Sequence, residues 1–267
     1  MDHLRNEVFI LSSLSNPFLV EMKGITQDNK FLYIGMEFVQ GGELFTYHRK
    51  MGKFPKIQTA FYAAQVVSMF EYLHSFNVIY RDLKPENLLI GSDGYLKLAD
   101  FGFAKIVKSR TYTLCGTPEY IAPEILLNKG HGKGVDWWTL GILIYEMIAG
   151  MDPFNADEPM RIYQKIIRGK IKFSRSFDSD AKSLVKHLLT ADLSKRYGNL
   201  KGASQDIKYH RFFDQINWRK LQKKQIVPPY KPQLRSIDDT GNFNFMGNSS
   251  TSFTKPVSPQ QDPFLEW

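Results

Sequence analysis

The stretch from Tyr80 to Gly102 constrains the fold of this chain more than any other part of its sequence. Two short apolar segments, 88–90 and 95–98, flank turn-forming residues at 91–94, and this pattern predicts a β-hairpin. Polar side chains precede and follow the hairpin, namely Arg81, Asp82, Lys84, Asn87 and Asp100. Because the two ends of a hairpin lie side by side, we expect two carboxylates and an amide to meet at one end of a small sheet.

Composition limits the class of protein. The chain has 267 residues, of which 43% are hydrophobic, enough for a sizeable core in one large domain or two small lobes. Its single cysteine, Cys115, excludes an internal disulfide framework and fits a reducing compartment. The basic residues behind the net charge of +8 do not form a dedicated stripe. A solvated helix face explains their densest run, 219–224. We therefore expect no nucleic-acid partner.

Hydrophobic periodicity predicts the main elements. We expect helices at 3–14, 44–49, 57–74, 135–148, 160–168 and 180–189, and strands at 18–26 and 31–38. The helix at 57–74 is expected to be amphipathic. The helix at 135–148 is apolar on nearly all sides and too short to cross a bilayer, which indicates a buried core helix. We expect loops at 192–209, an extended tail beyond Val227, no membrane span and no signal peptide.

Five motifs occur in a fixed order along the chain: GGE, YRDLKPEN, DFG, TLCGTPEYIAPE and DWW. With these motifs the chain resembles the AGC group of serine/threonine protein kinases, and within that group the catalytic subunits of cAMP-dependent protein kinases. The resemblance covers the whole chain. It implies an α+β fold with a partial N-terminal β lobe at 1–38, a hinge and mainly helical C-terminal lobe at 39–213, and an AGC-type tail at 214–267.

The same resemblance also sets two functional hypotheses against each other. The family's Gly-rich loop and strand lysine are not found before His3, so we expect the chain to begin inside the helix that carries Glu7. One hypothesis is an ATP-dependent kinase that phosphorylates Ser or Thr in proteins with upstream Arg residues. The alternative is a catalytically impaired fragment or pseudokinase that acts as a binding module. Retention of Asp82 and Asp100 favours an enzyme ancestry, whereas the missing lysine favours the binding module.

The resemblance assigns the chemistry to residues around the hairpin. Asp82 would orient the substrate hydroxyl and accept its proton, and Lys84 would contact the transferring phosphate. Asn87 and Asp100 would bind Mg²⁺, which prefers oxygen ligands. A single Asp in a loop is more often a turn former or a helix cap. Because two motifs occur in the right order around one hairpin, a catalytic role is favoured over a turn or a cap.

The resemblance also implies an ATP site. Its residues would be Glu7, Met36, Glu37, Val39, Glu43, Lys84, Glu86, Asn87, Leu89, Asp100 and Phe243. Glu37 and Val39 would offer backbone groups to adenine, and Phe243 of the tail would fold over the nucleotide. For Phe243, plain core packing is an equally good explanation. Ala99 replaces a hydroxyl residue that we expect in similar kinases, so one contact near the nucleotide would be lost.

Substrate recognition is expected to depend on acidic residues. The matching positions are Glu43, Glu86, Glu119 and Glu146, which would hold arginines of the substrate. A purely structural role is the alternative for Glu86 and Glu146. The resemblance further implies a cAMP-binding regulatory subunit as a partner and a cytoplasmic location, with the nucleus as a second location.

Two further expectations concern regulation and the alignment of the lobes. Thr113 is the expected phosphorylation site, with Thr111 competing, and Arg81, Lys105 and His3 would pair with its phosphate. Glu124 and Arg196 are expected to form a buried ion pair below that loop. A stack that aligns the two lobes would contain Leu11, Met22, Tyr80 and Phe101.

Overall fold

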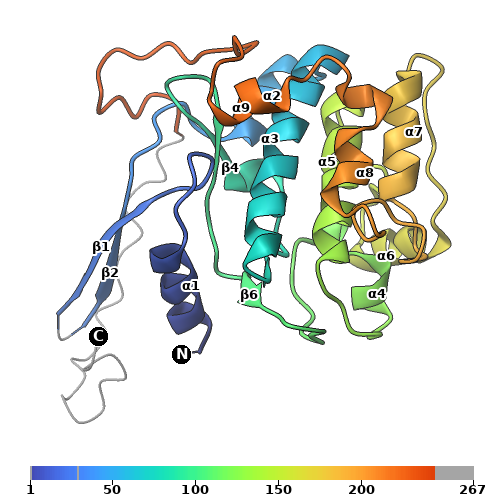
Figure 1. Ribbon diagram of the computed structural model, residues 1–267, viewed down its shortest axis with the longest axis horizontal. Coiled ribbons are helices and arrows are strands. Elements are labelled where there is room, and N and C mark those ends of the chain that lie inside the picture. The colour runs from blue at the N-terminus through green and yellow to red at the C-terminus, as the bar shows by residue number, and fades with distance from the viewer. Residues whose placement is uncertain (1, 29, 244–267) are drawn as a thin grey trace.

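The computed structural model describes residues 2–28 and 30–243, with side chains described from residue 4 onward. The fold is α+β, with a small lobe and a larger, mainly helical lobe (Figure 1). The small lobe contains α1 (Asp2–Ser13), β1 (Met22–Gln27) and β2 (Leu32–Met36). This arrangement agrees with the expected partial two-lobed fold. No helix among the described residues is both long and apolar enough to span a bilayer.

The small lobe rests on the larger one through backbone hydrogen bonds. Strands β1 and β2 pair antiparallel, with Ile25 opposite Ile34. The segment before β1 joins the hairpin, because the Val20 N–H donates to the Leu98 carbonyl at 2.9 Å and the Leu98 N–H donates to the Phe18 carbonyl at 2.8 Å. The expected strand at 18–26 therefore divides into a crossing segment and β1.

The larger lobe is built around two long helices, α3 (Lys56–Ser75) and α5 (Gly134–Ala149). Helix α5 is buried along nearly its whole length, as its continuous apolar sequence predicts. The amphipathic prediction for α3 is wrong, because neighbouring elements cover nearly all of its faces. Its buried Gln65 uses Oε1 to accept the Leu96 N–H at 2.7 Å, which connects α3 to the hairpin.

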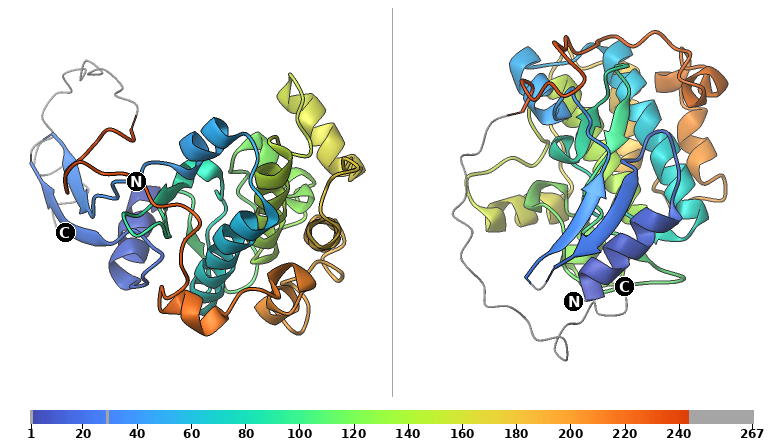
Figure 2. Two further views of the ribbon diagram at one scale, coloured as in Figure 1. Left: turned by 90° about the horizontal axis from the view of Figure 1, so that it is seen from above. Right: turned by 90° about the vertical axis from the view of Figure 1, so that its left-hand side faces the viewer.

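Shorter elements surround this pair of helices (Figures 1 and 2). The helices are α2 (Leu44–Met51), α4 (Pro123–Leu126), α6 (Pro159–Arg168), α7 (Ser179–Leu188), α8 (Ser204–Lys208) and α9 (Trp218–Gln222). Single 3₁₀ turns are η1 (Pro85–Asn87), η2 (Pro118–Tyr120) and η3 (Arg211–Phe213). Helix α8 lies within the segment that we expected to be loop-rich, because one short turn gives too little periodicity to detect.

Two short strand pairs form the floor between the lobes. Strand β4 (Leu88–Ile90) pairs antiparallel with β5 (Leu96–Leu98), so the predicted hairpin is present. Strands β3 (Val78–Ile79) and β6 (Lys105–Ile106) form a second pair that sequence periodicity did not reveal. Each of these strands has two residues, which is too few for an alternating pattern.

The described part of the tail returns from α9 across the larger lobe toward the small lobe (Figure 2). The Tyr230 ring stacks on Tyr47 with centroids 3.9 Å apart. Further along, Gln40 Nε2 donates to the Ile237 carbonyl at 3.0 Å. The tail therefore packs against both α2 and the hinge, as expected for an extended segment with aromatic anchors. From residue 244 onward, the expected tail at 214–267 lies outside the described residues.

Candidate active site

A buried carboxylate of α5 positions the catalytic loop. Asp136 accepts hydrogen bonds from the Tyr80 N–H at 3.0 Å and the Arg81 N–H at 2.8 Å. His74 Nε2 lies 2.7 Å from the same carboxylate. Arg81 has a φ of +70°, a strained value for a residue other than glycine. The two hydrogen bonds from consecutive backbone N–H groups stabilise this turn and direct the following residue into the cleft.

Asp82 lies at the centre of a compact polar cluster. Its side chain is 2% exposed, and Oδ2 lies 2.9 Å from Lys84 Nζ. Asn87 Nδ2 donates to the same oxygen at 2.9 Å and to the Asp82 carbonyl at 2.8 Å. Thr117 Oγ1 donates to Asp82 Oδ1 at 3.2 Å. Both predicted catalytic residues and the predicted metal ligand Asn87 are therefore together, and a threonine from the loop before η2 joins them.

The other predicted metal ligand follows the hairpin. Asp100 has a φ of +54°, and its Oδ1 accepts the Gly102 N–H at 3.1 Å. The Ala99 N–H donates to the Asn87 carbonyl at 2.9 Å, so the backbones of the two segments that carry the predicted metal ligands are joined. The expected convergence of two carboxylates and an amide at this end of the hairpin is therefore present in the backbone arrangement.

These donors fit Mg²⁺ held together with nucleotide phosphates. Both recorded hydrogen bonds of the Asn87 amide use its nitrogen, so Oδ1 can serve as an oxygen ligand. No group of three or more His, Cys, Asp or Glu side chains within the described chain could hold a metal by itself. Mg²⁺ ordinarily takes one or two carboxylates and completes its coordination with phosphates and water. The site therefore suits a metal that arrives with ATP.

The hinge lies against the hairpin, where the resemblance places adenine. Gly41 donates its N–H to the Ile90 carbonyl, and Ile90 donates back to the Gly42 carbonyl, both at 2.9 Å. Glu43 and Leu89 form an adjacent β-bridge. Within the described residues, the Glu37 carbonyl and the Val39 N–H take part in none of the recorded backbone hydrogen bonds. These two groups are therefore available to adenine.

The remaining hinge residues have mixed roles. The Glu37 side chain accepts a hydrogen bond from Lys97, so that carboxylate joins the hinge to β5 and does not face a ligand. Met36 is 48% exposed at the end of β2. Phe243 of the tail approaches Phe38, with ring centroids 5.8 Å apart. The tail therefore reaches Phe38 beside the hinge, and the expected contact of Phe243 with the nucleotide stays a prediction.

Glu7 projects from α1 toward Asp100. A Cβ placed on Gly102 would lie 3.1 Å from Asp100 Oδ1 and 3.9 Å from Glu7 Oε2, so both carboxylates approach this glycine. Burial and then the nearby Asp100 raise the pKa of Glu7. Tyr80 and Phe101 are in edge contact at 5.4 Å, and Leu11 belongs to the same buried core. Met22 packs against that core, so the four residues share one core, while an alignment of the lobes by their stacking stays a prediction.

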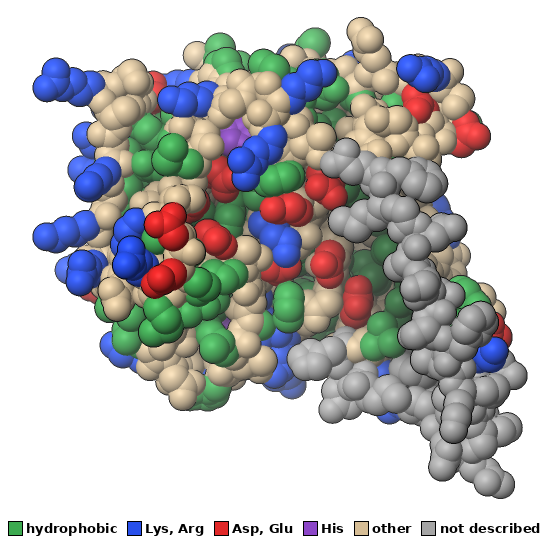
Figure 3. All heavy atoms as spheres, turned by 180° about the vertical axis from the view of Figure 1, so that it is seen from behind, with side chains coloured by type: hydrophobic (Ala, Val, Ile, Leu, Met, Phe, Trp, Pro, Cys, Tyr) green, Lys and Arg blue, Asp and Glu red, His purple; other side chains and the backbone are tan. Residues whose placement is uncertain are grey.

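Three predicted substrate-binding carboxylates act on one another electrostatically. Burial raises the pKa of Glu146 to about 7, with Asp152 and Glu86 adding to the rise, although a hydrogen bond from Tyr120 opposes it. Burial and Glu86 also raise the pKa of Glu43. Glu86 thus acts on both Glu43 and Glu146, and we call these three carboxylates the acidic group. Figure 3 shows acidic side chains gathered in the middle of one face, with Lys and Arg around them.

Glu119 is the predicted substrate residue that the structure does not tie to this group. It lies in η2 beside Tyr120 and is partly exposed. Asp152, which the sequence did not suggest, takes part instead through its effect on Glu146. Its Oδ1 also accepts the Phe154 N–H at 2.9 Å, which holds the loop after α5 in place.

The two candidate phosphorylation sites both lie in the loop between β6 and η2, but their surroundings differ. Thr113 is exposed, whereas Thr111 is 6% exposed and exchanges two backbone hydrogen bonds with His131. Lys105 Nζ also donates to Thr111 Oγ1 at 3.1 Å. Arg81 uses Nε to bind the Phe103 carbonyl, while its buried Nη1 has no partner within the described residues. A donor near the loop is therefore unused, although the His3 side chain lies outside the described residues.

The expected ion pair between Glu124 and Arg196 is present. Arg196 Nη1 and Nη2 bind the two carboxylate oxygens at 2.7 and 2.9 Å. The guanidinium is fully buried and also donates to the carbonyls of Thr190 and Gly134. It lies 5.1 Å from the Trp138 ring centroid. These contacts join the start of α4 to the segment after α7.

Sequence reasoning missed three functional side chains, Asp136, Thr117 and Asp152. Asp136 had a detectable signal, because a buried carboxylate among the apolar residues at the start of α5 must have partners. Thr117 lies inside a recognised motif, but its contact with Asp82 bridges 35 positions of sequence and has no periodic signature. Asp152 resembles any turn-forming Asp, so only the fold reveals its position.

Comparison with known proteins agrees with this geometry. Residues 1–213 match the family described as Protein kinase domain. The cAMP-dependent protein kinase catalytic subunit 3 of Drosophila melanogaster is 51% identical over 244 residues, which cover 91% of this chain and 42% of the relative. The cAMP-dependent protein kinase catalytic subunit of Dictyostelium discoideum is 50% identical, with 99% of this chain and 41% of the relative covered. The chain thus spans about two fifths of the length of these two relatives.

A third relative is covered more fully. The cAMP-dependent protein kinase catalytic subunit PRKX of Mus musculus is 48% identical over 256 residues, or 96% of this chain and 72% of the relative. The family match also includes the catalytic loop, the hairpin and the Glu124–Arg196 pair. The chain therefore belongs to the protein kinase family, in the group of cAMP-dependent protein kinase catalytic subunits.

Proposed function

We propose that this chain transfers the γ-phosphoryl group of ATP to Ser or Thr residues of proteins that carry Arg residues upstream. The observation that best supports the proposal is the cluster around Asp82, in which Lys84, Asn87 and Thr117 surround one buried carboxylate. Phosphoryl transfer depends mainly on positioning and charge neutralisation, and this cluster supplies both.

Each residue of the cluster has a separate task. Asp82 orients the substrate hydroxyl and accepts its proton, because its Oδ1 has only the exchangeable Thr117 hydroxyl as a recorded side-chain partner. Lys84 neutralises charge on the transferring phosphate. Asn87 and Asp100 provide oxygen ligands for Mg²⁺, which supplies charge neutralisation for the phosphates when bound. The Glu37 carbonyl and the Val39 N–H bind adenine at the hinge.

The acidic group supports the proposed substrate class. Glu86 contributes to the raised pKa of both Glu43 and Glu146, so the three carboxylates form one group of negative charge. A guanidinium group that enters this site relieves the repulsion and can form bidentate hydrogen bonds. The protein's overall charge of +8 would repel such a peptide, so its attraction must come from this local group. A cAMP-binding regulatory subunit with an Arg-rich segment would bind the same surface.

Peptide phosphorylation tests the proposed activity. The chain is incubated with Mg²⁺, radiolabelled ATP and an Arg-Arg-Ala-Ser peptide, and the initial rate is compared with that of the Asp82→Asn variant. We expect kcat to fall by roughly 10²-fold or more with little change in ATP affinity, as is typical when a general base is removed. Asp214→Asn, at an exposed position, is the matched control. An unchanged rate in Asp82→Asn would exclude the assigned role.

We also propose that phosphorylation of Thr113 orders the loop after β6. A phosphate brings about −1.5 to −2 charges at pH 7, and the unused Nη1 of Arg81 is a suitable partner. Active protein should therefore contain phosphate at Thr113 by mass spectrometry. Thr113→Ala should lower activity, while Ser109→Ala in the same exposed loop should not. Full activity of an unphosphorylated Thr113→Ala variant would contradict the proposal.

A second candidate is a non-catalytic module that binds a regulatory partner. It is favoured by the facing carboxylates of Glu7 and Asp100, because no ion pair to Glu7 is found within the described residues. The resemblance expects a lysine as its partner. This candidate predicts binding of an Arg-rich peptide without phosphoryl transfer. The kinase assay with parallel calorimetry therefore distinguishes the two candidates.

A further inference from the structure

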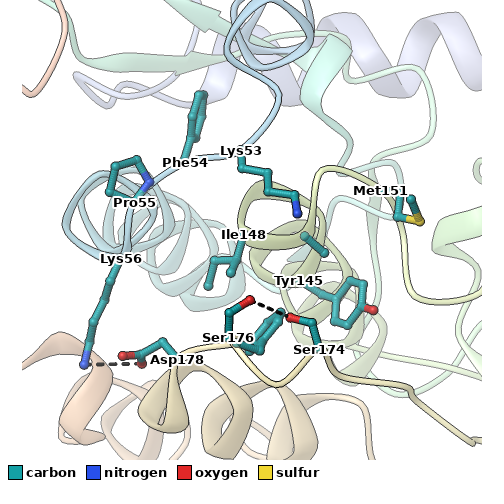
Figure 4. A pocket seen from close by; sticks show the side chains of 12 residues that line it. Lys53, Phe54, Pro55, Lys56, Tyr145, Ile148, Met151, Ser174, Ser176 and Asp178 are labelled. Atoms are coloured by element: carbon teal, nitrogen blue, oxygen red, sulfur yellow. Dashed lines mark hydrogen bonds and ion pairs between the residues drawn. The ribbon is translucent and has the colours of Figure 1, made fainter.

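A second cavity lies outside the candidate active site, on the larger lobe. It has a volume of about 520 Å³ and is formed by the segment between α2 and α3, the end of α5 and the segment between α6 and α7 (Figure 4). This volume lies within the range of ordinary small-molecule pockets. None of the residues assigned to ATP, metal, substrate or phosphorylation lines it.

The walls of the cavity are mainly apolar and aromatic. Phe54 and Phe177 are buried, and Ile148 and Ala149 form the adjacent wall at the end of α5. The Tyr145 ring stacks against Phe177, with centroids 5.4 Å apart. Because the aromatic rings are fixed by this packing, the cavity is preformed and offers flat apolar surfaces. Met151 is 60% exposed at its edge, so part of the apolar lining is in contact with water.

The cavity contains two lysines with different surroundings. Lys56 turns away from it and pairs with Asp178 at 3.3 Å and with Asp180. Lys53 extends over the cavity toward Ile148 and Tyr145 (Figure 4). In the part of the chain that the structure describes, no carboxylate lies within ion-pair distance of Lys53. The cavity therefore combines an apolar interior with one cation whose charge is not paired.

The Lys53 side chain is held in position along its stem. A Cβ placed on Gly150 would lie 3.3 Å from Lys53 Cγ and 3.6 Å from Lys53 Cε, so the stem runs close over this glycine. Gly150 ends α5 in a left-handed conformation, with a φ of +85°. Its lack of a side chain leaves room for the lysine stem, and the amine is thereby directed over the cavity. Ser174 and Ser176, whose hydroxyls lie 3.2 Å apart, add polar groups at the opposite edge.

We infer that this cavity binds a small aromatic carboxylate, whose ring system packs between Phe54, Ile148 and Phe177 while its carboxylate pairs with Lys53. Charge complementarity favours an anion, because the lining carboxylate of Asp178 is already paired with Lys56, whereas Lys53 has no carboxylate partner among the described residues. The aromatic lining favours a flat apolar body. The volume of the cavity, about 520 Å³, favours a small molecule.

Calorimetry with biphenyl-4-acetate tests the inference, and biphenyl-4-acetamide serves as the uncharged counterpart. We expect the carboxylate to bind with a dissociation constant below about 1 mM, a modest affinity for a ligand of this size. Lys53→Met keeps the apolar stem and removes the charge. It should weaken carboxylate binding by about three- to tenfold, as for a partly exposed ion pair, and leave amide binding unchanged.

Two further variants complete the experiment. Lys50→Met removes an exposed lysine three positions away that does not line the cavity, and it should bind both probes as the parent does. Ala149→Phe fills the cavity and should abolish binding of both probes, with its melting temperature reporting whether the fold is retained. Equal effects of Lys53→Met and Lys50→Met would overturn the inference. So would absence of saturable binding to the parent below about 1 mM.

Discussion

Two glutamates of the larger lobe, Glu124 and Glu146, are both largely withdrawn from water but have opposite surroundings. Glu124 is 5% exposed and receives two hydrogen bonds from the fully buried Arg196. Glu146 has one hydrogen bond from Tyr120 and faces two further carboxylates, Asp152 and Glu86. The first glutamate has a cation within the fold, and the second has none at ion-pair distance among the described residues.

This difference separates a structural carboxylate from the one that we propose for substrate recognition. A buried charge that is already paired has little left to offer a ligand, and its removal mainly affects folding. A buried carboxylate without a cation is costly to ionise, which is why the pKa of Glu146 rises to about 7. It can recover that cost by binding an arginine from another molecule. Perturbed carboxylates therefore mark functional sites more reliably than paired ones do.

The largest expected effect comes from breaking the structural pair. Arg196→Ala leaves Glu124 buried without its partner, so we expect the free energy of unfolding to fall by about 3 to 5 kcal/mol. Urea denaturation measures this loss. Lys195→Ala is the matched control, because the neighbouring Lys195 is exposed and pairs only with Asp192 at the surface. It should change stability by less than about 0.5 kcal/mol. Equal midpoints for both variants would refute the structural role of the pair.

A third buried carboxylate, Asp136, extends the comparison to the catalytic loop. Asp136→Asn replaces one of the two acceptor oxygens with an NH₂ group, so the side chain can no longer accept both the Tyr80 N–H and the Arg81 N–H. We expect a loss of about 2 to 3 kcal/mol in stability, together with lower kcat. Amide hydrogen exchange should show reduced protection at these two residues. Asp157→Asn, at an exposed position, should leave their protection unchanged, and unaltered exchange in Asp136→Asn would contradict the anchoring role.

Substrate choice tests the recognition carboxylate. Glu146→Gln keeps the shape of the side chain but cannot form an ion pair with arginine. We expect kcat/KM for an Arg-Arg-Ala-Ser peptide to fall by roughly 10- to 100-fold, and kcat/KM for its Ala-Ala counterpart to change little. Glu158→Gln, at an exposed position, is the control. Equal losses on both peptides would assign Glu146 a structural role instead.

The smallest expected effect is a dependence on pH. The pKa of Glu146 is raised to about 7 in the folded protein, so this group favours folding at low pH and loses that contribution as pH rises through 7. Binding of a substrate arginine has the opposite pH dependence, because it needs the ionised form of Glu146. KM for the Arg-Arg peptide should therefore be up to about tenfold higher at pH 6 than at pH 8. A profile identical to that of Glu146→Gln would show that another group titrates.

Local patterns were sufficient to predict much of this molecule. The turn residues between two apolar segments predicted the β4–β5 hairpin, and continuous hydrophobicity predicted that α5 is buried. Short pairs such as β3 and β6 were missed, because two residues carry no periodicity. The environment of α3 was wrongly predicted as well. Its burial on all sides depends on the elements packed around it, which its own pattern does not contain.

The candidate site also has features that the sequence predicted and features that only the structure revealed. The sequence by itself determined which chemical groups are present near the hairpin, because Asp82, Lys84 and Asn87 lie within a few residues of one another. The tertiary structure alone decided that Thr117 joins them, that Asp136 anchors their loop and that Glu146 meets Asp152 with no cation at ion-pair distance among the described residues. The physical reason is that proximity across the chain and removal from water both arise from packing. Hydrogen bonds and pKa shifts depend on those two conditions, which local sequence does not specify.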